Sequence, residues 1–539
     1  MVSHAFDRNP PRQTKEWDTG RIGLVGGPCD ILHWTAVRAA VKGVGMKWNR
    51  GMRIVCGVAM WVILEVSGAW VHCLADAQGK PAAATVPALM LSDIHFEPFF
   101  DPGKAMQLAA APVGAWKGIL AGAPLADREQ RFAALEQTCQ TRGEDTSFSL
   151  LESSLQAMRK DAAGARFVTV SGDLIAHAFD CKFGAVFPHA AAADYRAFVE
   201  KTLDFVMEEV DGAFPGVPVY WALGNNDSGC GDYKLDSNSE FLATVGEEAT
   251  KTFPADERKS AGETFAAGGY YSVRLPEPVE NTRLLVLDDL FMSSKYTTCG
   301  GRADASGAET QLAWLAQQLA DARRKGEKVW VMAHIPPGVD GHASAARMDQ
   351  LCGARGPRMF LGSEKLAEVL AANSDVVKLA IFAHTHMDEV RILKAEKGAQ
   401  DFAAGPGAAV KMVSSISPIN GNAPSFTVAH VVAKTAGLKD FRVFAASNST
   451  GVDTAWHEEY DWGKTYGAAE FSAATVGKVI ADFEADPGAN TDASRAYINN
   501  FDVGSSPLLG LIWPQYVCAL RNDSAQSFKD CVCKTPNGK

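Results

Sequence analysis

The chain has 539 residues, 47% of them hydrophobic and 21% charged, which is typical of a folded globular protein. Its length allows a large α/β core together with an accessory domain. A net charge of −11 argues against nucleic acid or anionic lipid as the main partner, because an acidic surface repels both.

Residues 46–77 have the organisation of a secretory signal peptide. Basic residues precede an apolar run, and the segment ends in small residues suited to cleavage. Glu65 and His72 interrupt the apolar run, so we expect no stable membrane span after cleavage; an uncleaved anchor or a buried helix is the alternative. Residues 1–77 are thus expected to be an upstream extension followed by a signal peptide, and the mature protein is expected to be periplasmic or secreted.

From residue 86 onward, short apolar runs alternate with amphipathic segments. The apolar runs predict strands at 86–92, 166–172, 217–224, 283–289, 328–334 and 377–384, and the amphipathic segments predict helices at 148–161, 195–210 and 309–326. Strands that are apolar throughout and alternate with helices indicate sheets whose faces are covered by helices.

The pattern changes near residue 440. Two more strand-like runs, 426–433 and 441–447, precede an aromatic-rich stretch at 456–467 that we expect to be helix and loop. Its aromatic residues recur at near-helical spacing, which favours a core between domains over a lipid-binding patch. We therefore predict a main domain at 84–440 and a smaller, mostly helical C-terminal subdomain at 441–539.

Eight of the 11 cysteines follow the proposed cleavage point. They are Cys139, Cys181, Cys230, Cys299, Cys352, Cys518, Cys531 and Cys533. An even, scattered set predicts up to four disulfides in an oxidising compartment. Zinc binding by the Cys-x-Cys pair near the C-terminus is the alternative.

Polar side chains collect directly after five of the predicted strands. In chain order they are Asp93 and His95, then Asp173, then Asn225, Asn226 and Asp227, then His334, and finally His384 and His386. Ligands of α/β folds bind outside the carboxyl ends of the strands, and the two histidines of a His-x-His sequence face the same side in extended chain. This ordered set of oxygen and nitrogen donors predicts a site for two metal ions.

The ordered set resembles the calcineurin-like metallophosphoesterase superfamily over about residues 86–390. Within it, LSDIHFEPFFDP (91–102), SGDLIAH (171–177) and the cysteine-bearing tail are similar to acid sphingomyelinase-like phosphodiesterases, a secreted and disulfide-bonded branch. The resemblance implies a four-layer α/β/β/α sandwich, two divalent metal ions and hydrolysis of a phosphodiester or a related phosphoester.

The resemblance also implies a ligand set for each ion. One ion would be held by Asp93, His95, Asp173 and His386, and the other by Asp173, Asn225, His334 and His384, with Asp173 as the bridge. Imidazole and carboxylate ligands suit zinc, with iron and manganese as alternatives. The implied mechanism is in-line attack of a metal-bound hydroxide on phosphorus.

The sequence departs from the superfamily at Asn226, where most members have a histidine that protonates the leaving group. An amide can donate a hydrogen bond but cannot deliver a proton. Three explanations stay open: the leaving group needs no proton, another residue supplies it, or the site binds metal without turnover. For the second explanation the candidate is His177, which matches a histidine that acid sphingomyelinase-like enzymes place beside the substrate phosphate; its alternative role is to support neighbouring groups.

Smaller features of the same loops carry expectations too. Gly224 is expected to allow the turn, Asp227 to brace the loop, and Ala383, where the superfamily usually has glycine, to have a negative φ. The Gly-Asn-Asn-Asp sequence is also the form seen in endopolyphosphatase-like relatives, whose leaving group is a phosphate chain. Expected substrates are therefore a small-molecule, lipid or polyphosphate phosphoester. The alternatives are a polyphosphatase or nucleotide phosphohydrolase on the same scaffold and, from another class, a non-catalytic metal- or phosphate-binding protein.

Overall fold

The computed structural model describes residues 84–345, 351–353, 355–394, 407–504 and 506–534. Residues 83–539 form one compact unit. The predicted upstream extension and signal peptide, 1–77, lie outside the described residues.

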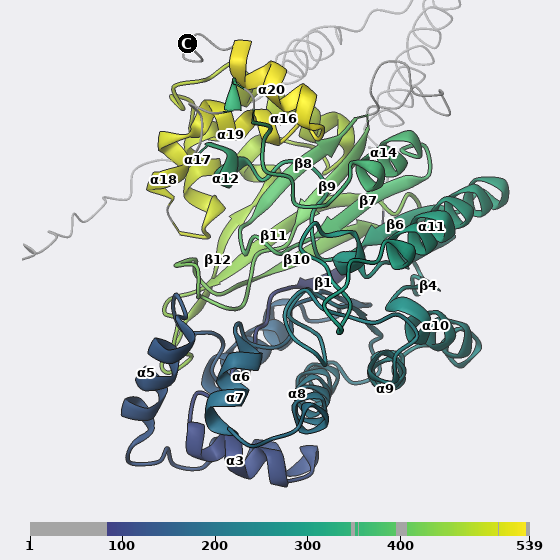
Figure 1. Cartoon of the computed structure of the whole chain (residues 1–539). Helices are drawn as coiled ribbons and strands as arrows, with labels where there is room; N and C mark the ends of the chain where they lie inside the picture. The colour runs from purple at the N-terminus through teal and green to yellow at the C-terminus, as the bar shows by residue number, and fades with distance from the viewer. Residues whose placement is uncertain (1–83, 346–350, 354, 395–406, 505, 535–539) are drawn as a thin grey trace, which may run out of the picture. The chain divides into compact units, whose positions relative to one another are not determined.

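Within the described residues the strands form two six-stranded sheets (Figure 1). The first sheet contains, in spatial order, β12 (Trp456–Asp461), β11 (Leu438–Ala446), β10 (Ser425–Val432), β1 (Thr85–Leu91), β2 (Val168–Ser171) and β3 (Val219–Ala222). The strands β1, β2 and β3 run parallel, so their carboxyl ends lie at one edge of the sheet. The strands β10, β11 and β12 extend it in antiparallel fashion.

The second sheet places a further parallel set beside the first. Its order is β4 (Tyr271–Arg274), β5 (Thr282–Val286), β6 (Lys328–Met332), β7 (Val377–Phe382), β9 (Ala408–Met412) and β8 (Glu389–Leu393). The strands β5, β6, β7 and β9 are parallel, and β4 and β8 pair antiparallel at the two margins. The sequence patterns identified β5, β6 and β7 but not β4, β8 and β9.

The two sheets pack on each other through large buried side chains. Trp330 of β6 packs edge-on against Phe167 at 5.6 Å and donates a 2.7 Å hydrogen bond to the carbonyl of Ala436, beyond β10. Tyr271 of β4 donates a 2.8 Å bond to the carbonyl of Trp221 in β3. Both tryptophan rings are fully buried, so the contact between the sheets is part of the apolar core.

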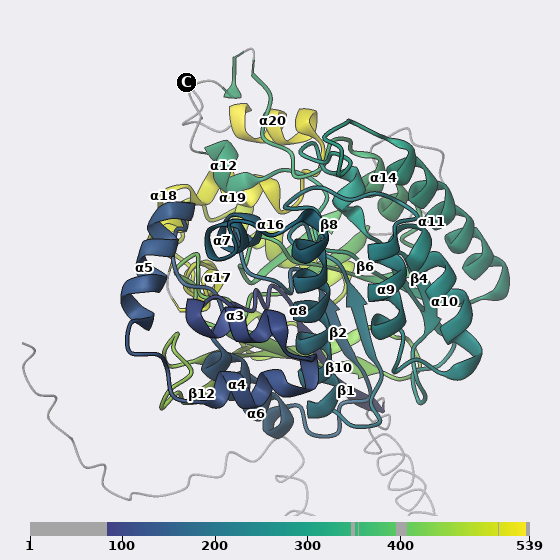
Figure 2. The same cartoon turned by 60° about the horizontal axis from the view of Figure 1, so that its bottom comes forward.

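Helices cover the outer faces of both sheets (Figures 1 and 2). Around the first sheet lie α3 (Pro102–Ala110), α4 (Trp116–Ala121), α5 (Arg128–Cys139), α6 (Phe148–Asp161), α7 (Phe179–Val186), α8 (Ala192–Ala213) and α9 (Glu240–Ala249). The helix α6 packs on β10 and α9 packs on β3. On the second sheet, α10 (Ala255–Gly268) packs on β4, α11 (Ser306–Lys325) on β5 and β6, and α14 (Lys365–Ala372) on β8. The predicted four-layer α/β/β/α sandwich is confirmed.

Local sequence signals set the ends of these helices. Ser147 caps α6 by accepting a hydrogen bond from the backbone N–H of Leu150, and the predicted helix 148–161 is confirmed. Gly326 ends α11 in the left-handed conformation that glycine adopts most readily. The helix begins three residues before the predicted 309–326 segment.

The C-terminal part is mostly helical. It contains α15 (Trp462–Tyr466), α16 (Ala473–Glu484), α17 (Asp492–Phe501), α18 (Pro507–Leu511), α19 (Trp513–Ala519) and α20 (Ala525–Lys534). Figures 1 and 2 show α16 to α20 gathered together, and α19 packs on α12 (Gly341–Ala345). The strands β11 and β12 continue the first sheet beyond residue 440, and a domain division at that point stays a prediction.

The aromatic-rich stretch differs from its expected structure. Residues Trp456–Asp461 form β12 instead of helix, because they pair with β11 along the edge of the sheet. Tyr460 and Trp462 are nonetheless buried in the core. In the described chain no helix is long and apolar enough to cross a membrane.

All eight cysteines of the predicted set are paired. The bridges are Cys139–Cys181, Cys230–Cys299, Cys352–Cys533 and Cys518–Cys531. The prediction of four disulfides is confirmed, and zinc binding by the C-terminal Cys-x-Cys pair is excluded because both sulfurs are bonded elsewhere.

Candidate metal centre

The structure brings together all seven residues predicted as metal ligands. Asp93 and His95 follow β1, Asp173 follows β2, Asn225 follows β3, His334 follows β6, and His384 and His386 follow β7. Parallel strands of both sheets end at the same place, which explains how residues nearly 300 positions apart meet.

Five of these residues have left-handed backbone conformations. The φ angles are +46° for Asp93, +45° for His95, +56° for Asp173, +73° for His384 and +68° for His386. Each such residue costs about 1–2 kcal/mol relative to a right-handed conformation. Strain repeated at five converging side chains is typical of a functional site, where the surrounding fold maintains it.

The first group of donors consists of Asp93, His95, Asp173 and His386. The Nε2 atom of His95 lies 3.8 Å from Asp93 Oδ1 and 3.5 Å from Asp173 Oδ2. His386 Nε2 lies 3.6 Å from Asp93 Oδ1. Four atoms that each bind one zinc ion at about 2.0–2.1 Å in tetrahedral geometry lie about 3.3 Å apart, so this spacing fits a shared ion.

The second group shares Asp173 with the first. His334 Nε2 lies 3.1 Å from Asp173 Oδ2, and His384 Nδ1 lies 3.2 Å from His334 Nε2. Asn225 lines the same pocket as Asp173 and His384. Asp173 thus faces both groups, as a carboxylate that bridges two ions must.

Several buried donor atoms of the two groups have no hydrogen-bond partner. These are both carboxylate oxygens of Asp93, Nε2 of His95 and Oδ1 of Asn225. Leaving such atoms unpaired in the interior costs about 1–3 kcal/mol each, and more for a charged group. Divalent cations that bind these atoms would remove that cost, so the residues present fit a dinuclear metal centre.

Backbone carbonyls fix the orientation of two of the imidazole rings. Nδ1 of His95 lies 2.9 Å from the carbonyl of Ile175, and Nδ1 of His334 lies 2.8 Å from the carbonyl of Ser171. A carbonyl oxygen only accepts, so each Nδ1 carries the hydrogen. Each Nε2 therefore faces the site, and loss of its proton on metal binding would leave a lone pair directed at the ion, as in the usual arrangement of a metal-binding histidine.

The histidines keep the buried carboxylates ionised. Burial would raise the pKa of Asp93, but His386 and His95 outweigh burial and lower it to about 2. Burial opposes ionisation of Asp173 in the same way, and His334 and His95 hold its pKa well below its ordinary value. Both carboxylates therefore carry the charge that a divalent cation requires.

The four histidines divide into two pairs. Burial would lower the pKa values of His95 and His334, but Asp173 outweighs it and raises them to about 9 and about 10. Burial lowers the pKa values of His384 and His386 to about 3. His384 and His386 are therefore neutral at pH 7, the form in which imidazole binds metal.

Gly224 and Asp227 hold the loops close together. A Cβ on Gly224 would lie 2.1 Å from Asp173 Oδ1, so the turn needs glycine at this position for the close approach. Asp227 accepts hydrogen bonds from the backbone N–H groups of Gly224, Leu174 and Ile175 at 2.7–3.1 Å. Its predicted role as a brace is confirmed. Ala383 has no positive φ, as its methyl group requires.

Asn226 is directed at Asp173 and does not face the pocket. Its backbone N–H donates to Asp173 Oδ1 and its side-chain amide donates to Oδ2, both at 2.9 Å. The residue is only 5% exposed. These contacts stabilise the ionised form of Asp173 and leave the position without a proton donor.

His177 lies at the edge of the same site. Its ring stacks on His95 with centroids 3.9 Å apart, and it is 33% exposed and lines the pocket. Asp145 accepts hydrogen bonds from the backbone N–H of His177 at 2.8 Å and from its Nδ1 at 3.1 Å. Nδ1 is thus occupied, and Nε2 is the nitrogen of His177 free to interact with a ligand.

Asp145 contacts His177 at the edge of the site, and the sequence patterns did not identify it. It is fully buried and also accepts a 2.7 Å hydrogen bond from Ser417. Burial would raise the pKa of Asp145, but His177, His95 and Lys182 hold it well below its ordinary value. Asp145 lies in the loop before α6, outside any motif, so no sequence pattern marked it as part of the site.

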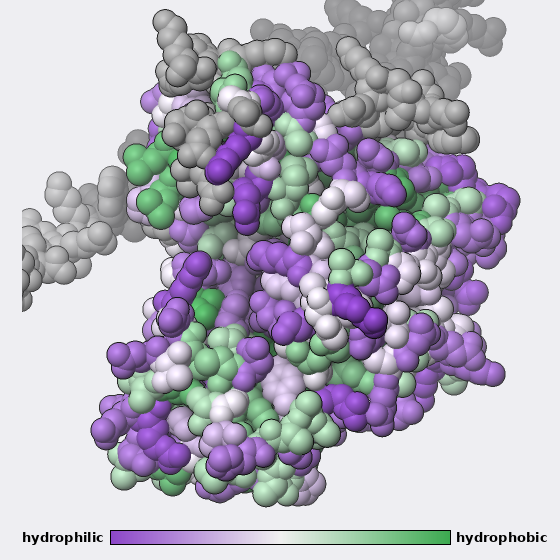
Figure 3. All heavy atoms as spheres, viewed as in Figure 1, coloured by the Kyte–Doolittle hydropathy of each residue, from purple (hydrophilic) through white to green (hydrophobic). Residues whose placement is uncertain are grey.

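Four of the seven residues line a pocket of about 360 Å³ that also contains Lys295, Tyr233 and Arg142; the four are Asp173, Asn225, His384 and His386. A second pocket of about 390 Å³ shares His384 and Arg142 with it and extends to Leu508 of α18. Figure 3 shows the surface hollowed between α18 and α5, with apolar side chains gathered over α18. Leu508 and Leu511 are 63% and 79% exposed.

Comparisons with known proteins agree with this geometry. The profile of the calcineurin-like phosphoesterase family matches residues 86–388, a range that includes all the predicted site residues. The chain is 26% identical to acid sphingomyelinase-like phosphodiesterase 3b of Homo sapiens over 404 residues, covering 72% of this chain and 80% of that protein. It is 22% identical to the cyclic GMP-AMP phosphodiesterase of Rattus norvegicus over 404 residues (72% and 82%), and 25% identical to sphingomyelinase phosphodiesterase C of Dictyostelium discoideum over 248 residues (46% and 49%).

Proposed function

The chain belongs to the calcineurin-like phosphoesterase family and is a phosphoric ester hydrolase, and from this premise we propose that it is a secreted phosphodiesterase with a dinuclear metal centre. The observation that carries the proposal is the set of buried, unpaired donor atoms on Asp93, His95 and Asn225. These metal-binding atoms converge from several strand ends, and no contact among the described residues satisfies them. Bound cations would satisfy them.

The proposed ligands are those that the resemblance implies. Asp93, His95, Asp173 and His386 would hold one divalent ion, and Asp173, Asn225, His334 and His384 would hold the other. The donors are nitrogen and oxygen without thiolate, which favours zinc, iron or manganese, and we propose zinc. When bound, such a pair of ions supplies an activated water nucleophile and neutralises charge on the phosphoryl oxygens.

The chain's own residues would position the substrate and the leaving group. Asn226 keeps Asp173 ionised and in place through two hydrogen bonds. His177, anchored through Nδ1 by Asp145, presents Nε2 to the pocket and is our candidate for the general acid. Because the Asp145 carboxylate can only accept, the hydrogen on Nδ1 is fixed, and His177 would act as the acid through Nε2 in its doubly protonated form.

The proposal includes export of the protein. Four disulfides support it, because such bonds persist in oxidising compartments and are rare in the cytosol. The proposed signal at 46–77 is the sequence feature that directs export. Determination of the N-terminal residue of the exported protein tests this part: a mature chain that still begins before residue 46 contradicts it.

A second candidate function is favoured by Asn226. A polyphosphatase or a nucleotide phosphohydrolase expels a phosphate or a nucleotide phosphate, which leaves without a proton, so the missing donor would be no handicap. The relatives are named for sphingomyelinase activity and for hydrolysis of cyclic GMP-AMP, and both substrate classes are phosphodiesters.

Metal analysis combined with hydrolysis of bis-p-nitrophenyl phosphate tests the proposal. The p-nitrophenolate group leaves without protonation, so the assay does not depend on the identity of the acid. The proposed function predicts turnover that is lost with chelation and restored by zinc. Metal-replete protein that leaves this substrate intact would indicate a non-catalytic metal- or phosphate-binding protein instead.

A further inference from the structure

Two cationic side chains, Lys295 and Arg142, line the pocket beside the proposed metal ligands. Among the residues that the structure describes, neither has a carboxylate within ion-pair distance, and Arg142 makes no hydrogen bond. The chain as a whole has a net charge of −11, so carboxylates are abundant elsewhere. Cations that stand without an acidic partner in this pocket make it complementary to an anion.

Lys295 is held in place by Tyr233. Its Nζ donates a 3.2 Å hydrogen bond to the Tyr233 hydroxyl and lies 4.4 Å from the centroid of the ring. Tyr233 is buried, and its hydroxyl lies 3.4 Å from Nε2 of His384. Because the hydroxyl accepts from Lys295, its own hydrogen can be donated to a ligand oxygen in the pocket. A lysine fixed in this way loses less side-chain entropy on binding than a free one.

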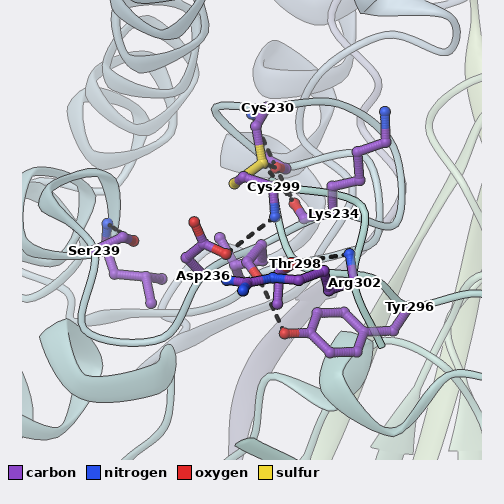
Figure 4. The surroundings of a disulfide bond; sticks show 11 residues. Cys230, Lys234, Asp236, Ser239, Tyr296, Thr298, Cys299 and Arg302 are labelled. Atoms are coloured by element: carbon purple, nitrogen blue, oxygen red, sulfur yellow. Dashed lines mark hydrogen bonds between the residues drawn. A yellow bond between two sulfur atoms is a disulfide. The ribbon is translucent and has the colours of Figure 1, made fainter. Parts of the chain in front are cut away.

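The loops that carry Tyr233 and Lys295 are joined to each other. The Cys230–Cys299 disulfide links them, and Figure 4 shows Asp236 accepting a 3.0 Å hydrogen bond from the backbone of Cys299 beside it. Thr297 donates its backbone N–H to the carbonyl of Tyr233 at 3.0 Å. The spacing between Tyr233 and Lys295 is therefore a property of the fold and not of one flexible side chain.

We propose that Lys295, Tyr233 and Arg142 form an anion-binding subsite that holds a second phosphate group of the substrate, next to the one that is hydrolysed. The proposal rests on the proposed function, which places the reacting phosphate at the metal ligands. It assigns the substrate to the condensed phosphates, a chemistry shared by inorganic polyphosphate and nucleoside di- and triphosphates. Arginine and lysine are the side chains best suited to phosphate oxygens.

Two neighbouring residues bear on this assignment. Asp232 is an acidic residue of the same pocket wall that interacts electrostatically with Lys295, and its Oδ1 accepts a 2.8 Å hydrogen bond from the amide of Asn225. Asn226 provides no proton to a leaving group, and a phosphate leaving group requires none. The cations and the absence of a proton donor at position 226 therefore favour the same substrate class.

The test is competition with bis-p-nitrophenyl phosphate by orthophosphate and by methylenediphosphonate, using zinc-loaded protein. The wild type is expected to bind the diphosphonate about tenfold more tightly than orthophosphate, the size of one charge-assisted hydrogen bond. Lys295→Ala and Arg142→Ala should each reduce this ratio about fivefold or more, while Lys295→Arg retains it. The diphosphonate chelates free zinc to the same extent in every sample, so the comparison is made between variants.

Lys259→Ala is the matched control, because Lys259 is 87% exposed on α10 and lies 3.9 Å from an acidic partner, Glu263. It should leave the ratio unchanged. A wild-type ratio near one, or a ratio that both Lys295→Ala and Arg142→Ala leave intact, overturns the inference. Arg142 is exposed and free of hydrogen bonds, so its variant tests the subsite even if Lys295→Ala fails to fold.

Turnover of tripolyphosphate and of ATP distinguishes the two sources of a second phosphate. We expect at least one of them to be hydrolysed. Lys295→Ala and Arg142→Ala should each lower kcat/KM for that compound about tenfold or more, relative to their effect on kcat/KM for bis-p-nitrophenyl phosphate. Hydrolysis of bis-p-nitrophenyl phosphate with no turnover of either compound refutes the subsite and leaves the proposed function standing. If no preparation hydrolyses bis-p-nitrophenyl phosphate, the proposed function fails, and calorimetric binding of the two anions still measures the ratio.

Discussion

Replacement of Asp145 by asparagine tests how His177 is used. Asparagine has almost the same shape but no charge, so the packing around this buried position is retained. The hydrogen bond from His177 Nδ1, 3.1 Å long, would lose its charge-assisted character, and an amide placed with its NH₂ group toward the ring could not accept it. His177 would then be free to rotate away from the pocket.

The expected loss follows from the strength of that bond. A hydrogen bond to a charged group contributes about 1.5–3 kcal/mol, which corresponds to about 10- to 100-fold in rate if it acts in the transition state. We expect Asp145→Asn to lower kcat/KM by about this factor for glycerophosphocholine, whose alkoxide leaving group needs a proton. For bis-p-nitrophenyl phosphate, whose leaving group needs none, the loss should be less than about threefold.

A double-mutant cycle with His177→Ala shows whether Asp145 acts through His177. If it does, the double variant is no slower on glycerophosphocholine than His177→Ala alone, which itself should lose about 10²–10⁴-fold. Equal losses on both substrates, or additive losses in the double variant, would refute the reasoning and assign Asp145 a structural role. Urea unfolding of each variant provides the control for stability.

Three further predictions concern the fold. Gly172→Ala should lower the free energy of unfolding by more than about 2 kcal/mol in urea titrations, because φ is +93° and a Cβ would lie 2.7 Å from the backbone N of Gly224; an unchanged midpoint contradicts this. Burial and the neighbouring Glu248 raise the pKa of Asp211 to about 7, so the native state binds its proton more tightly than the unfolded state, and stability is lost as pH rises through 7. Asp211→Asn should therefore gain about 1 kcal/mol on the wild type between pH 5 and pH 8, after allowance for its partial exposure, whereas a pH-independent difference would refute this. Replacing both cysteines of the Cys352–Cys533 bridge, which are 181 residues apart, should cost about 2–5 kcal/mol under oxidising conditions, and a fully stable variant would be inconsistent with the bridge.

The meeting of the proposed metal ligands was predictable because each follows a strand that its own pattern identifies. Asp93, Asp173 and His334 come directly after buried apolar runs, and the carboxyl ends of parallel strands meet at one edge. No comparable local signal marks Asp145, which reaches His177 only through packing between loops. The Tyr233–Lys295 contact likewise depends on a disulfide and on backbone pairing between loops 62 residues apart.

The missed strands carry charges that resemble surface residues in the sequence. In β8, Glu389 and Arg391 are buried and form an ion pair with each other, and in β9 the buried Lys411 donates to Asp388 at 2.7 Å. Burial of a charge is tolerated only when such a partner is present, and the partner is visible only in the folded chain. The strand β12 was missed for a similar reason. Its pairing with β11 is visible only in the folded chain, and this pairing outweighs the helical spacing of its aromatic residues.

Metal content measured together with activity is the sharpest test of the proposed dinuclear centre. We expect two zinc ions per purified chain, loss of bis-p-nitrophenyl phosphate hydrolysis on chelation, and recovery when zinc is returned. Asp173→Asn, which alters the carboxylate facing both groups, should lower the metal content below two and reduce activity by at least about 10²-fold. Full activity in metal-free protein, or an Asp173→Asn variant that retains two ions and wild-type turnover, would rule out the dinuclear centre.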